Sequence, residues 1–339
     1  MSRVLVTGGT GFIASYCLAA LTAAGHEVAA TVRRRARVQD LRETAAASGA
    51  FGEAVETFEA DLLEDAGWAD AVRGCDFVLH VASPFGGPDA ENEDALISAA
   101  RDGSLRVLRA ARDAGVRRVV MTSSFAAVGY GHEDRAEAFT ETDWSRLERP
   151  DVAPYIRSKT LAERAAWDFM AAEGEGMELT AINPVGVFGP VLGPDYSSSI
   201  DLIRRLLDGS VSRVPQIFFA LADVRDVADL HVRAMTASHA AGERFIAAAG
   251  EPMSMLEVCD VLRTALGAAA GKVPSQALPD DLVRTLVETS PHLRQIVPNL
   301  GKRRRASSSK ARQALGWTPR PNEAVIEATA RSLLARGLV

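Results

Sequence analysis

A short apolar stretch that runs directly into a glycine-rich turn constrains the fold of this chain more than any other feature. Residues 3–7 are typical of a buried strand, and helical periodicity begins just after the glycines and ends near Gly25. The spacing of Gly8, Gly11 and Ala14 lets the backbone approach a pyrophosphate at the positive end of that helix. The sequence therefore predicts a dinucleotide-binding turn, with a tight turn that binds nothing as the alternative.

Strand-like and helix-like stretches alternate along most of the chain. This alternation predicts a Rossmann fold, a doubly wound parallel sheet with helices on both faces. Ligands of such folds sit beyond the carboxyl ends of the strands, where the motifs described here fall. The expected strands cover residues 27–32, 54–59, 76–81, 118–122, 179–183 and 243–247, and the expected long helices cover about 91–114, 155–172 and 224–237.

Arginine occupies the end of the second expected strand. An acidic residue at this place would bind a free ribose 2'-hydroxyl, whereas an arginine accommodates a 2'-phosphate. The position is held by Arg33, and no acidic residue comes before Asp40. The sequence therefore favours NADPH over NADH. Arg35 and Arg37 are also consistent with a solvated helix start.

Tyr155 and Lys159 stand four residues apart in a helix-forming run, so their side chains share one face. A nearby ammonium favours the phenolate and moves the tyrosine pKa toward the range in which a general acid or base works best. Lysine is rare in this chain, since the others are Lys272, Lys302 and Lys310 and every other strongly basic side chain is arginine. The pair predicts acid–base chemistry, with an ordinary surface helix turn as the alternative.

Composition excludes several classes of function. The 44 acidic and 38 basic side chains leave a net charge of -6, which gives no reason to expect a nucleic-acid partner. No apolar run approaches the ~18 residues that cross a bilayer, and the first expected strand leaves no room for a signal peptide. Cys17, Cys75 and Cys259 lack metal-type spacing and fit free thiols in a reducing cytoplasm. No metal site is expected.

Prolines and irregular turns gather in two separate stretches, about residues 190–221 and 250–339. We expect these stretches to form a smaller substrate-binding cap over a Rossmann domain made of residues 1–189 and about 222–249. Specificity is expected in the cap and in the long loop of residues 125–154. Four phenylalanines fit either an apolar substrate pocket or the core: Phe85, Phe188, Phe218 and Phe219.

A basic run, Lys302 to Arg305, precedes three serines in the second of these stretches. It is compatible with a nucleic-acid patch or a phosphorylation site. Because the chain as a whole is acidic, we favour a solvated loop.

Three motifs stand in order along the chain: Gly8-x-x-Gly11-x-x-Ala14, Thr122-Ser123-Ser124 and Tyr155-x-x-x-Lys159. With them the chain resembles an extended short-chain dehydrogenase/reductase over nearly its whole length. Within that superfamily it resembles the dihydroflavonol-4-reductase-like branch, which includes cinnamoyl-CoA reductases and microbial aldehyde and ketone reductases. Further matching stretches are residues 31–33, 80–84, 158–163, 183–184, 223–228 and 309–317. Ala14 replaces the usual third glycine.

The resemblance implies a catalytic trio of Ser124, Tyr155 and Lys159. Ser124 is preferred over Ser123 because it lies at the family's distance before the tyrosine. Phe85, together with Ser124 and Tyr155, is expected to contact the substrate. The residues that the family would use for NADP(H) are Gly8, Gly11, Phe12, Ile13, Arg33, Asp61, Leu62, Val81, Ala82, Ser83, Tyr155, Lys159, Pro184, Val187 and Ser199.

The implied activity is reduction of an aldehyde or ketone to an alcohol. Tyr155 would donate a proton to the carbonyl oxygen, Ser124 would hydrogen-bond that oxygen, and Lys159 would tune Tyr155 and bind the ribose. The binding partner is then a small carbonyl or alcohol molecule of unidentified structure. For the oligomeric state, the sequence is compatible with a monomer and with a homodimer.

Two other functions remain as alternatives. The first is a nucleotide-sugar epimerase or dehydratase, and two features count against it. Dehydratases usually carry an acidic pair directly after the Thr122 position, where this chain has Ser123-Ser124. The sixth expected strand ends in residues 183–186, Asn-Pro-Val-Gly, where sugar-modifying relatives have an asparagine-aromatic-glycine pattern. A regulator that senses NADP without turnover usually lacks the catalytic tyrosine, which this chain keeps.

Overall fold

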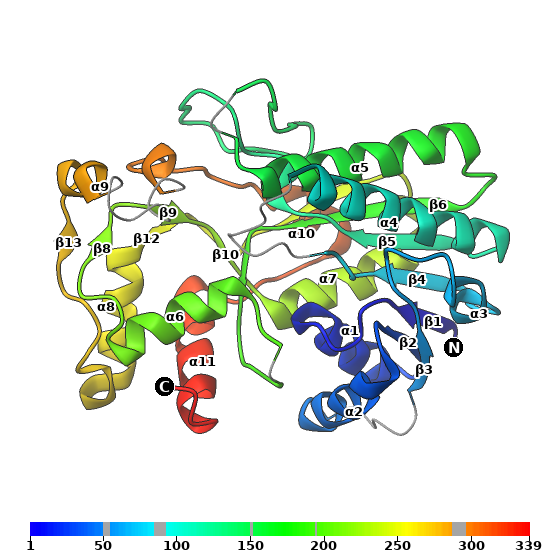
Figure 1. The fold of residues 1–339 in the computed structure, drawn as a ribbon, viewed down its shortest axis with the longest axis horizontal. Helices are drawn as coiled ribbons and strands as arrows, with labels where there is room; N and C mark the ends of the chain where they lie inside the picture. The colour runs from blue at the N-terminus through cyan, green and yellow to red at the C-terminus, as the bar shows by residue number, and fades with distance from the viewer. Residues whose placement is uncertain (50–54, 85–92, 150–151, 194, 287–295) are drawn as a thin grey trace.

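Seven parallel strands form the centre of the computed structural model (Figure 1), which describes residues 1–49, 55–84, 93–149, 152–193, 195–286 and 296–339. Their order across the sheet is β11-β6-β5-β4-β1-β2-β3. The strands are β1 (Arg3–Val6), β2 (Glu27–Val32), β3 (Glu56–Glu59), β4 (Phe77–His80), β5 (Arg118–Thr122), β6 (Glu178–Pro184) and β11 (Arg244–Ala247). The predicted Rossmann fold is confirmed.

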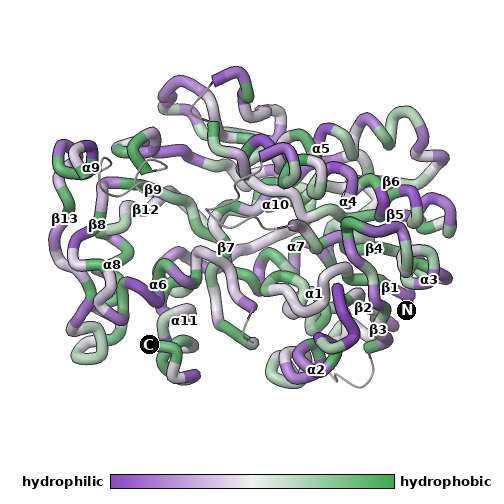
Figure 2. Tube along the Cα trace, viewed as in Figure 1, coloured by the Kyte–Doolittle hydropathy of each residue, from purple (hydrophilic) through white to green (hydrophobic). Residues whose placement is uncertain are grey.

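Helices cover both faces of this sheet. One face carries α1 (Phe12–Ala23), α2 (Val38–Ala47) and α7 (Val224–Thr236), whose leucines pack into a common core with β1, β2 and β4. The other face carries α3 (Trp68–Val72), α4 (Glu93–Asp113) and α5 (Pro154–Glu173). In Figure 2 the central strands are largely hydrophobic, as expected for strands buried on both faces.

Most expected elements agree with the observed ones to within a few residues. The expected strand at 54–59 begins at Glu56 among the described residues, and the expected helix at about 91–114 is described from Glu93 to Asp113. Helix boundaries fray, and differences of one or two residues carry no weight.

A second hydrophobic core lies beside the sheet, on the left in Figure 1. It is built by α6 (Ser198–Asp208), α8 (Met255–Leu266) and α11 (Asn322–Ala335), and Phe12 of α1 packs against it. This second core falls in the stretches expected to form a cap, and the cap's boundaries and its substrate-binding role both stay predictions. Its short strands were not expected from the sequence: β8 (Val214–Pro215) pairs with β13 (Ala277–Leu278), and β9 (Phe218–Phe219) pairs with β12 (Met253–Ser254).

The chain returns to the sheet before its last helix. Helix α10 (Ser309–Leu315) and Trp317 join the core that α7 forms with the sheet. The Trp317 indole donates a hydrogen bond of 2.8 Å to the carbonyl of Asp226, and the Arg320 amide donates one of 2.7 Å to its carboxylate. The end of the chain is therefore bound to both cores.

None of the helices in the described ranges combines the length and the apolar content that crossing a membrane requires.

A buried histidine of α7 fixes the end of β5. His231 is fully buried, with its Nδ1 2.8 Å from the carbonyl of Val227 and its Nε2 2.7 Å from Thr122 Oγ1. Because a carbonyl only accepts, Nδ1 carries the proton and Nε2 accepts from the Thr122 hydroxyl. The ring is thus neutral, and burial lowers its pKa to about 4 despite the hydrogen bond to Val227. Thr122 immediately precedes the serine pair of the predicted site.

We expect His231 to make the protein less stable in mild acid. Its folded-state pKa lies below the ordinary ~6.5, so its stabilising effect is complete above pH ~6.5 and is lost as the pH falls toward 4. Within this window each such group changes the free energy of unfolding by about 1.4 kcal/mol per pH unit. Urea unfolding from pH 7.5 to 4.5 should therefore show a shallower pH slope for His231→Gln. Equal slopes in both proteins would contradict the argument.

Candidate active site

The predicted site residues gather at one edge of the sheet, where the parallel strands end. Gly8 follows β1, Arg33 follows β2, Asp61 follows β3, and Ala82 and Ser83 follow β4. Ser124 comes two residues after β5, and Pro184 ends β6. Phe85 lies outside the described residues.

The glycine turn has the geometry that a pyrophosphate cradle requires. Gly8 has a φ of +67°, and a Cβ there would lie 3.0 Å from the Cβ of Ala82. Helix α1 starts without a side-chain cap and without an acid in its first turn. In the described part of the chain, the amide groups of Phe12 and Ile13 have no backbone partner. Free amides at a helix N-terminus favour a bound anion, so these residues fit a dinucleotide phosphate.

A chain of buried hydrogen bonds holds this turn against the end of β4. Thr7 Oγ1 accepts from the amides of Val81 (3.0 Å) and Ala82 (2.9 Å) and lies 3.0 Å from His80 Nδ1. Burial, and then the charge of Lys159, lower the His80 pKa to about 3. The neutral His80 ring can accept a hydrogen bond from the Thr7 hydroxyl. These contacts fix the distance between the glycine turn and the end of β4.

Four arginines follow β2, and they differ in how firmly they are bound. Arg35 pairs with Glu59 at 3.6 Å, and Arg37 pairs with Asp40 and with Asp195. The side chain of Arg33 is 69% exposed, and its ion pair with Asp61 is long, at 3.8 Å. Arg33 and Arg35 thus each make one long ion pair from an exposed side chain, whereas two carboxylates hold Arg37. Arg33 is free to turn toward a phosphate at this edge, and its cofactor role stays a prediction.

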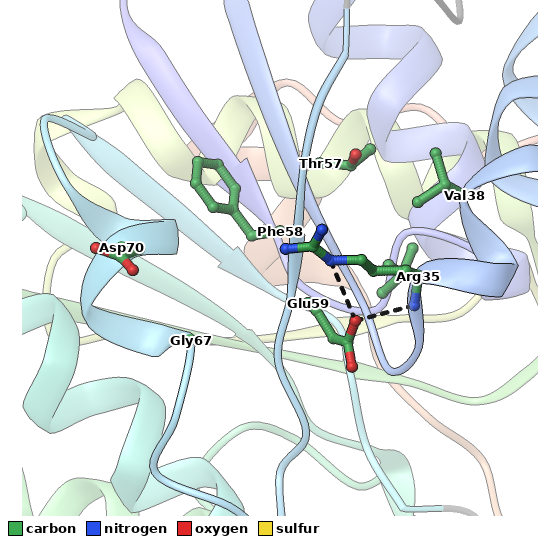
Figure 3. A pocket seen from close by; sticks show the side chains of 8 residues that line it. Arg35, Val38, Thr57, Phe58, Glu59, Gly67 and Asp70 are labelled. Atoms are coloured by element: carbon green, nitrogen blue, oxygen red, sulfur yellow. Dashed lines mark hydrogen bonds and ion pairs between the residues drawn. The ribbon is translucent and has the colours of Figure 1, made fainter.

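An open pocket of about 450 Å³ lies along the outer strand β3 (Figure 3). The ion pair between Arg35 and Glu59 lies in this pocket. This pocket contains neither Ser124, Tyr155 nor Lys159. Its lining residues are Val32, Arg35, Val38, Thr57, Phe58, Glu59, Gly67 and Asp70.

Ser124 and Tyr155 are brought together by β5 and α5. Tyr155 lies in the first turn of α5, and its side chain is hydrogen-bonded to that of Ser124. Burial raises the Tyr155 pKa, the hydrogen bond with Ser124 lowers it, and the nearby Tyr130 raises it. The net direction is upward, which differs from the lowered value expected from Lys159. Burial of the phenol is the dominant cause.

Lys159 lies one turn along α5, with Nζ 5.9 Å from the centre of the Tyr155 ring. Its ammonium donates a 2.8 Å hydrogen bond to Ser83 Oγ. Burial lowers its pKa to about 8, against the charge of Glu163, which raises it. Lys159 therefore remains mostly charged at neutral pH and connects α5 with the end of β4.

A fully buried carboxylate, Glu163, lies one further turn along the same helix. One of its oxygens accepts from Ser123 Oγ (2.5 Å) and from Asn183 Nδ2 (2.7 Å), and the other accepts from Arg244 Nε (2.6 Å). Asn183 also donates to the carbonyl of Ser124 at 3.2 Å. Glu163 thus ties α5 to the ends of β5 and β6 and to β11. The Ser123 hydroxyl is therefore engaged in a hydrogen bond to Glu163.

Arg244 extends the network into the loop of residues 125–154. Its guanidinium donates to the carbonyls of Glu141 (2.7 Å) and Asp143 (2.9 Å), and it stacks on the Trp144 ring at 3.8 Å. Arg157 at the start of α5 donates to the carbonyl of Leu147 at 2.6 Å. These contacts anchor the loop to the sheet and to α5.

The remaining predicted contacts lie near the second core. Val187 packs against it, and Ser199 Oγ would be 3.7 Å from a Cβ at Gly186. Phe188 is 1% exposed and stacks on Phe219 with ring centres 5.9 Å apart, so Phe188 belongs to the core.

The sequence predicted no role for three residues of the site: Glu163 and Asn183, which lie in stretches that match the family, and Arg244. One signal was available, because Glu163 lies four residues after Lys159 on the helix that carries Tyr155. Arg244 had no local signal, since its partners are distant in sequence.

A family model describes the same stretch that builds the sheet. The NAD dependent epimerase/dehydratase family matches residues 4–248. The chain belongs to this family. Its predicted membership of the extended short-chain dehydrogenase/reductases is thereby confirmed.

Individual relatives are similar over most of their length. Cinnamoyl-CoA reductase CAD2 of Medicago truncatula is 35% identical over 247 residues, which cover 70% of this chain and 74% of the relative. Ketoreductase azaE of Aspergillus niger is 31% identical over 303 residues, covering 83% and 87%. The structure of the yeast methylglyoxal/isovaleraldehyde reductase Gre2, complexed with NADPH, aligns with a TM-score of 0.82 at 25% identity, covering 99% of this chain and all of Gre2.

We expect Arg33→Asp to lower the preference for NADPH over NADH by roughly ten- to a hundredfold, because a charged hydrogen bond to the 2'-phosphate is replaced by repulsion. The measurement is cofactor affinity by fluorescence titration with each nucleotide. Arg37→Asp is the matched control, since Arg37 is held by ion pairs with Asp40 and Asp195. An unchanged preference in Arg33→Asp would mean that the phosphate is recognised elsewhere.

We expect Glu163→Gln to reduce the free energy of unfolding by about 3–5 kcal/mol, because it leaves the buried Arg244 without its counter-charge. Glu173→Gln, on the same helix, is the control. Glu173 is half exposed and paired with Arg112, so its loss should cost less than about 1 kcal/mol. Chemical denaturation measures both. Similar losses in the two variants would show that the buried network contributes no more than a surface ion pair.

Proposed function

We propose that this protein is an NADPH-dependent reductase that converts an aldehyde or ketone into an alcohol. The observation that carries the proposal is the hydrogen-bonded pair Ser124 and Tyr155, with Lys159 one turn away, at the sheet edge that also holds the glycine turn. The relatives described above, named as reductases, agree with it.

Tyr155 is the proton donor in this proposal. Its raised pKa keeps the phenol protonated at neutral pH, which suits a group that gives a proton to a developing alkoxide. Ser124 offers its hydroxyl to the same oxygen. One fixed donor of this kind is typically worth about 3–4 kcal/mol of transition-state stabilisation.

Lys159 has a positioning role in this proposal. With Nζ already bound to Ser83, it stands between the end of β4 and Tyr155, where it would bind the ribose hydroxyls of the cofactor. Its positive charge also favours negative charge that develops on the Tyr155 oxygen as the proton leaves.

Bound NADPH would supply the hydride that the carbonyl carbon receives. The chain would bind its pyrophosphate at Gly8, Gly11, Phe12 and Ile13 and its 2'-phosphate at Arg33. The other residues that we assign to the cofactor are Asp61, Leu62, Val81, Ala82, Ser83, Pro184, Val187 and Ser199.

A nucleotide-sugar epimerase or dehydratase is the second candidate, because the family model carries that name. Against it, the position after Thr122 holds Ser123 and Ser124 where dehydratases carry acids, and Ser123 is occupied by Glu163. A regulator without turnover would have no need of the intact trio.

We also propose that residues of about 190–221 and 250–339 act as the substrate-binding cap, which the separate second core supports. Three free, buried cysteines support a reducing, cytoplasmic location. A monomer or a homodimer is compatible with this proposal.

The direct test is consumption of NADPH with a panel of aromatic and aliphatic aldehydes and ketones, run in parallel with NADH. We expect turnover with NADPH. Tyr155→Phe should lose nearly all turnover and still bind NADPH, since only the proton donor is removed. Full activity of Tyr155→Phe would refute the assigned role. A wild-type protein that retains tightly bound nucleotide and turns over no carbonyl would favour the epimerase alternative.

A further inference from the structure

The basic run from Lys302 to Arg305 is not a uniformly solvated loop. Arg303 and Arg305 are exposed, whereas Arg304 is half-buried. In Figure 1 this orange segment crosses from the second core toward α10. Its bridge to Phe139 places it beside the loop that follows β5.

Backbone pairing fixes the position of this segment. The Phe139 amide donates to the carbonyl of Arg305 (2.8 Å), and the Ser307 amide donates to the carbonyl of Phe139 (2.8 Å). Ala306 packs on the cluster that contains Phe125 and Phe139. The loop after β5 and the end of the chain are thus held in register, and this register places Arg304.

The guanidinium of Arg304 lies over the ring of Tyr130, 4.6 Å from its centre. Tyr130 packs edge-on against Phe125, the residue next to Ser124, with ring centres 6.2 Å apart. Through the rings of Tyr130 and Phe125, Arg304 is therefore linked to the residue that directly follows Ser124.

Within the described chain, Arg304 has no carboxylate partner. Its one hydrogen bond is to Asn299 Oδ1, at 3.0 Å. The neighbouring Arg305 pairs with Glu251 at 2.9 Å, and Lys310 pairs with Glu243. A half-buried guanidinium without a counter-charge is unusual in a chain with more acidic than basic side chains. The hydroxyl of Tyr130 likewise has no hydrogen-bond partner among the described residues.

We propose that Arg304, supported on the Tyr130 ring, binds a carboxylate on the substrate, so that the protein prefers carbonyl compounds that carry a second, anionic group. The planar fork of arginine matches a carboxylate in two parallel hydrogen bonds. The aromatic ring beneath it keeps the guanidinium in place, and the nitrogens other than the one bound to Asn299 are left to donate to the carboxylate. This inference rests on the proposed carbonyl reduction and specifies its substrate class.

The test compares matched pairs of aldehydes: 3- and 4-carboxybenzaldehyde and their methyl esters, each with NADPH. In the wild-type protein we expect kcat/KM to be roughly ten- to a hundredfold higher for the acids, as a charged hydrogen bond in a partly buried site provides. The difference should lie in KM, since the carboxylate is remote from the reacting carbon. Arg304→Gln should abolish this preference and leave the esters within about twofold of the wild-type protein.

Two further variants separate binding from structural support. Arg303→Gln, one residue away and stacked on Phe218, should retain the preference for the acids. Arg304→Lys keeps the positive charge without the planar fork of arginine, and it should retain part of the preference for the acids over the esters.

Each contrary result has its own meaning. If Arg304→Gln slows the acids and the esters alike, Arg304 is a structural support and the inference is wrong. If the wild-type protein reduces both kinds of aldehyde equally well, the inference is also wrong, while carbonyl reduction stands. If no aldehyde is reduced, the proposed function fails and the inference fails with it.

Discussion

The buried ion pair between Glu163 and Arg244 is the interaction on which the site depends. Charges removed from water are stable only when they are paired and fully hydrogen-bonded. Here the carboxylate is shared by a serine after β5, an asparagine in β6 and an arginine in β11, and it projects from the helix that carries Tyr155 and Lys159. A single charge therefore sets the spacing between Ser124 and Tyr155.

Much of the fold and of the candidate site could be predicted from the sequence, because the information is local. The strand that runs into Gly8 and Gly11 predicts a glycine turn from a few neighbouring residues. In the same way, a tyrosine four residues before Lys159 predicts that both side chains share one face of a helix. Because the strands are parallel, the motifs that follow their carboxyl ends all lie at the same edge of the sheet. Ser124 meets Tyr155 for this reason, although they are 31 residues apart in the chain.

The remainder depends on contacts that no local pattern encodes. Arg244 and Glu163 are 81 residues apart, and Arg304 reaches Tyr130 across a still longer stretch of chain. The Tyr155 pKa was misjudged for a related reason. A spacing of four residues reveals the cation at Lys159, but burial becomes visible only in the folded molecule, and burial has the larger effect.

The path of the last 40 residues has a consequence for exchanging specificity between relatives. The segment around Ala306 pairs with the loop after β5, and Trp317 then completes the core beneath α7, before α11 goes back to the second core. The chain after residue 250 is therefore not a detachable module. A chimera that replaced everything after residue 250 would also remove part of the core that α7 forms with the sheet, whereas a graft that keeps residues 306–320 of this chain would preserve it.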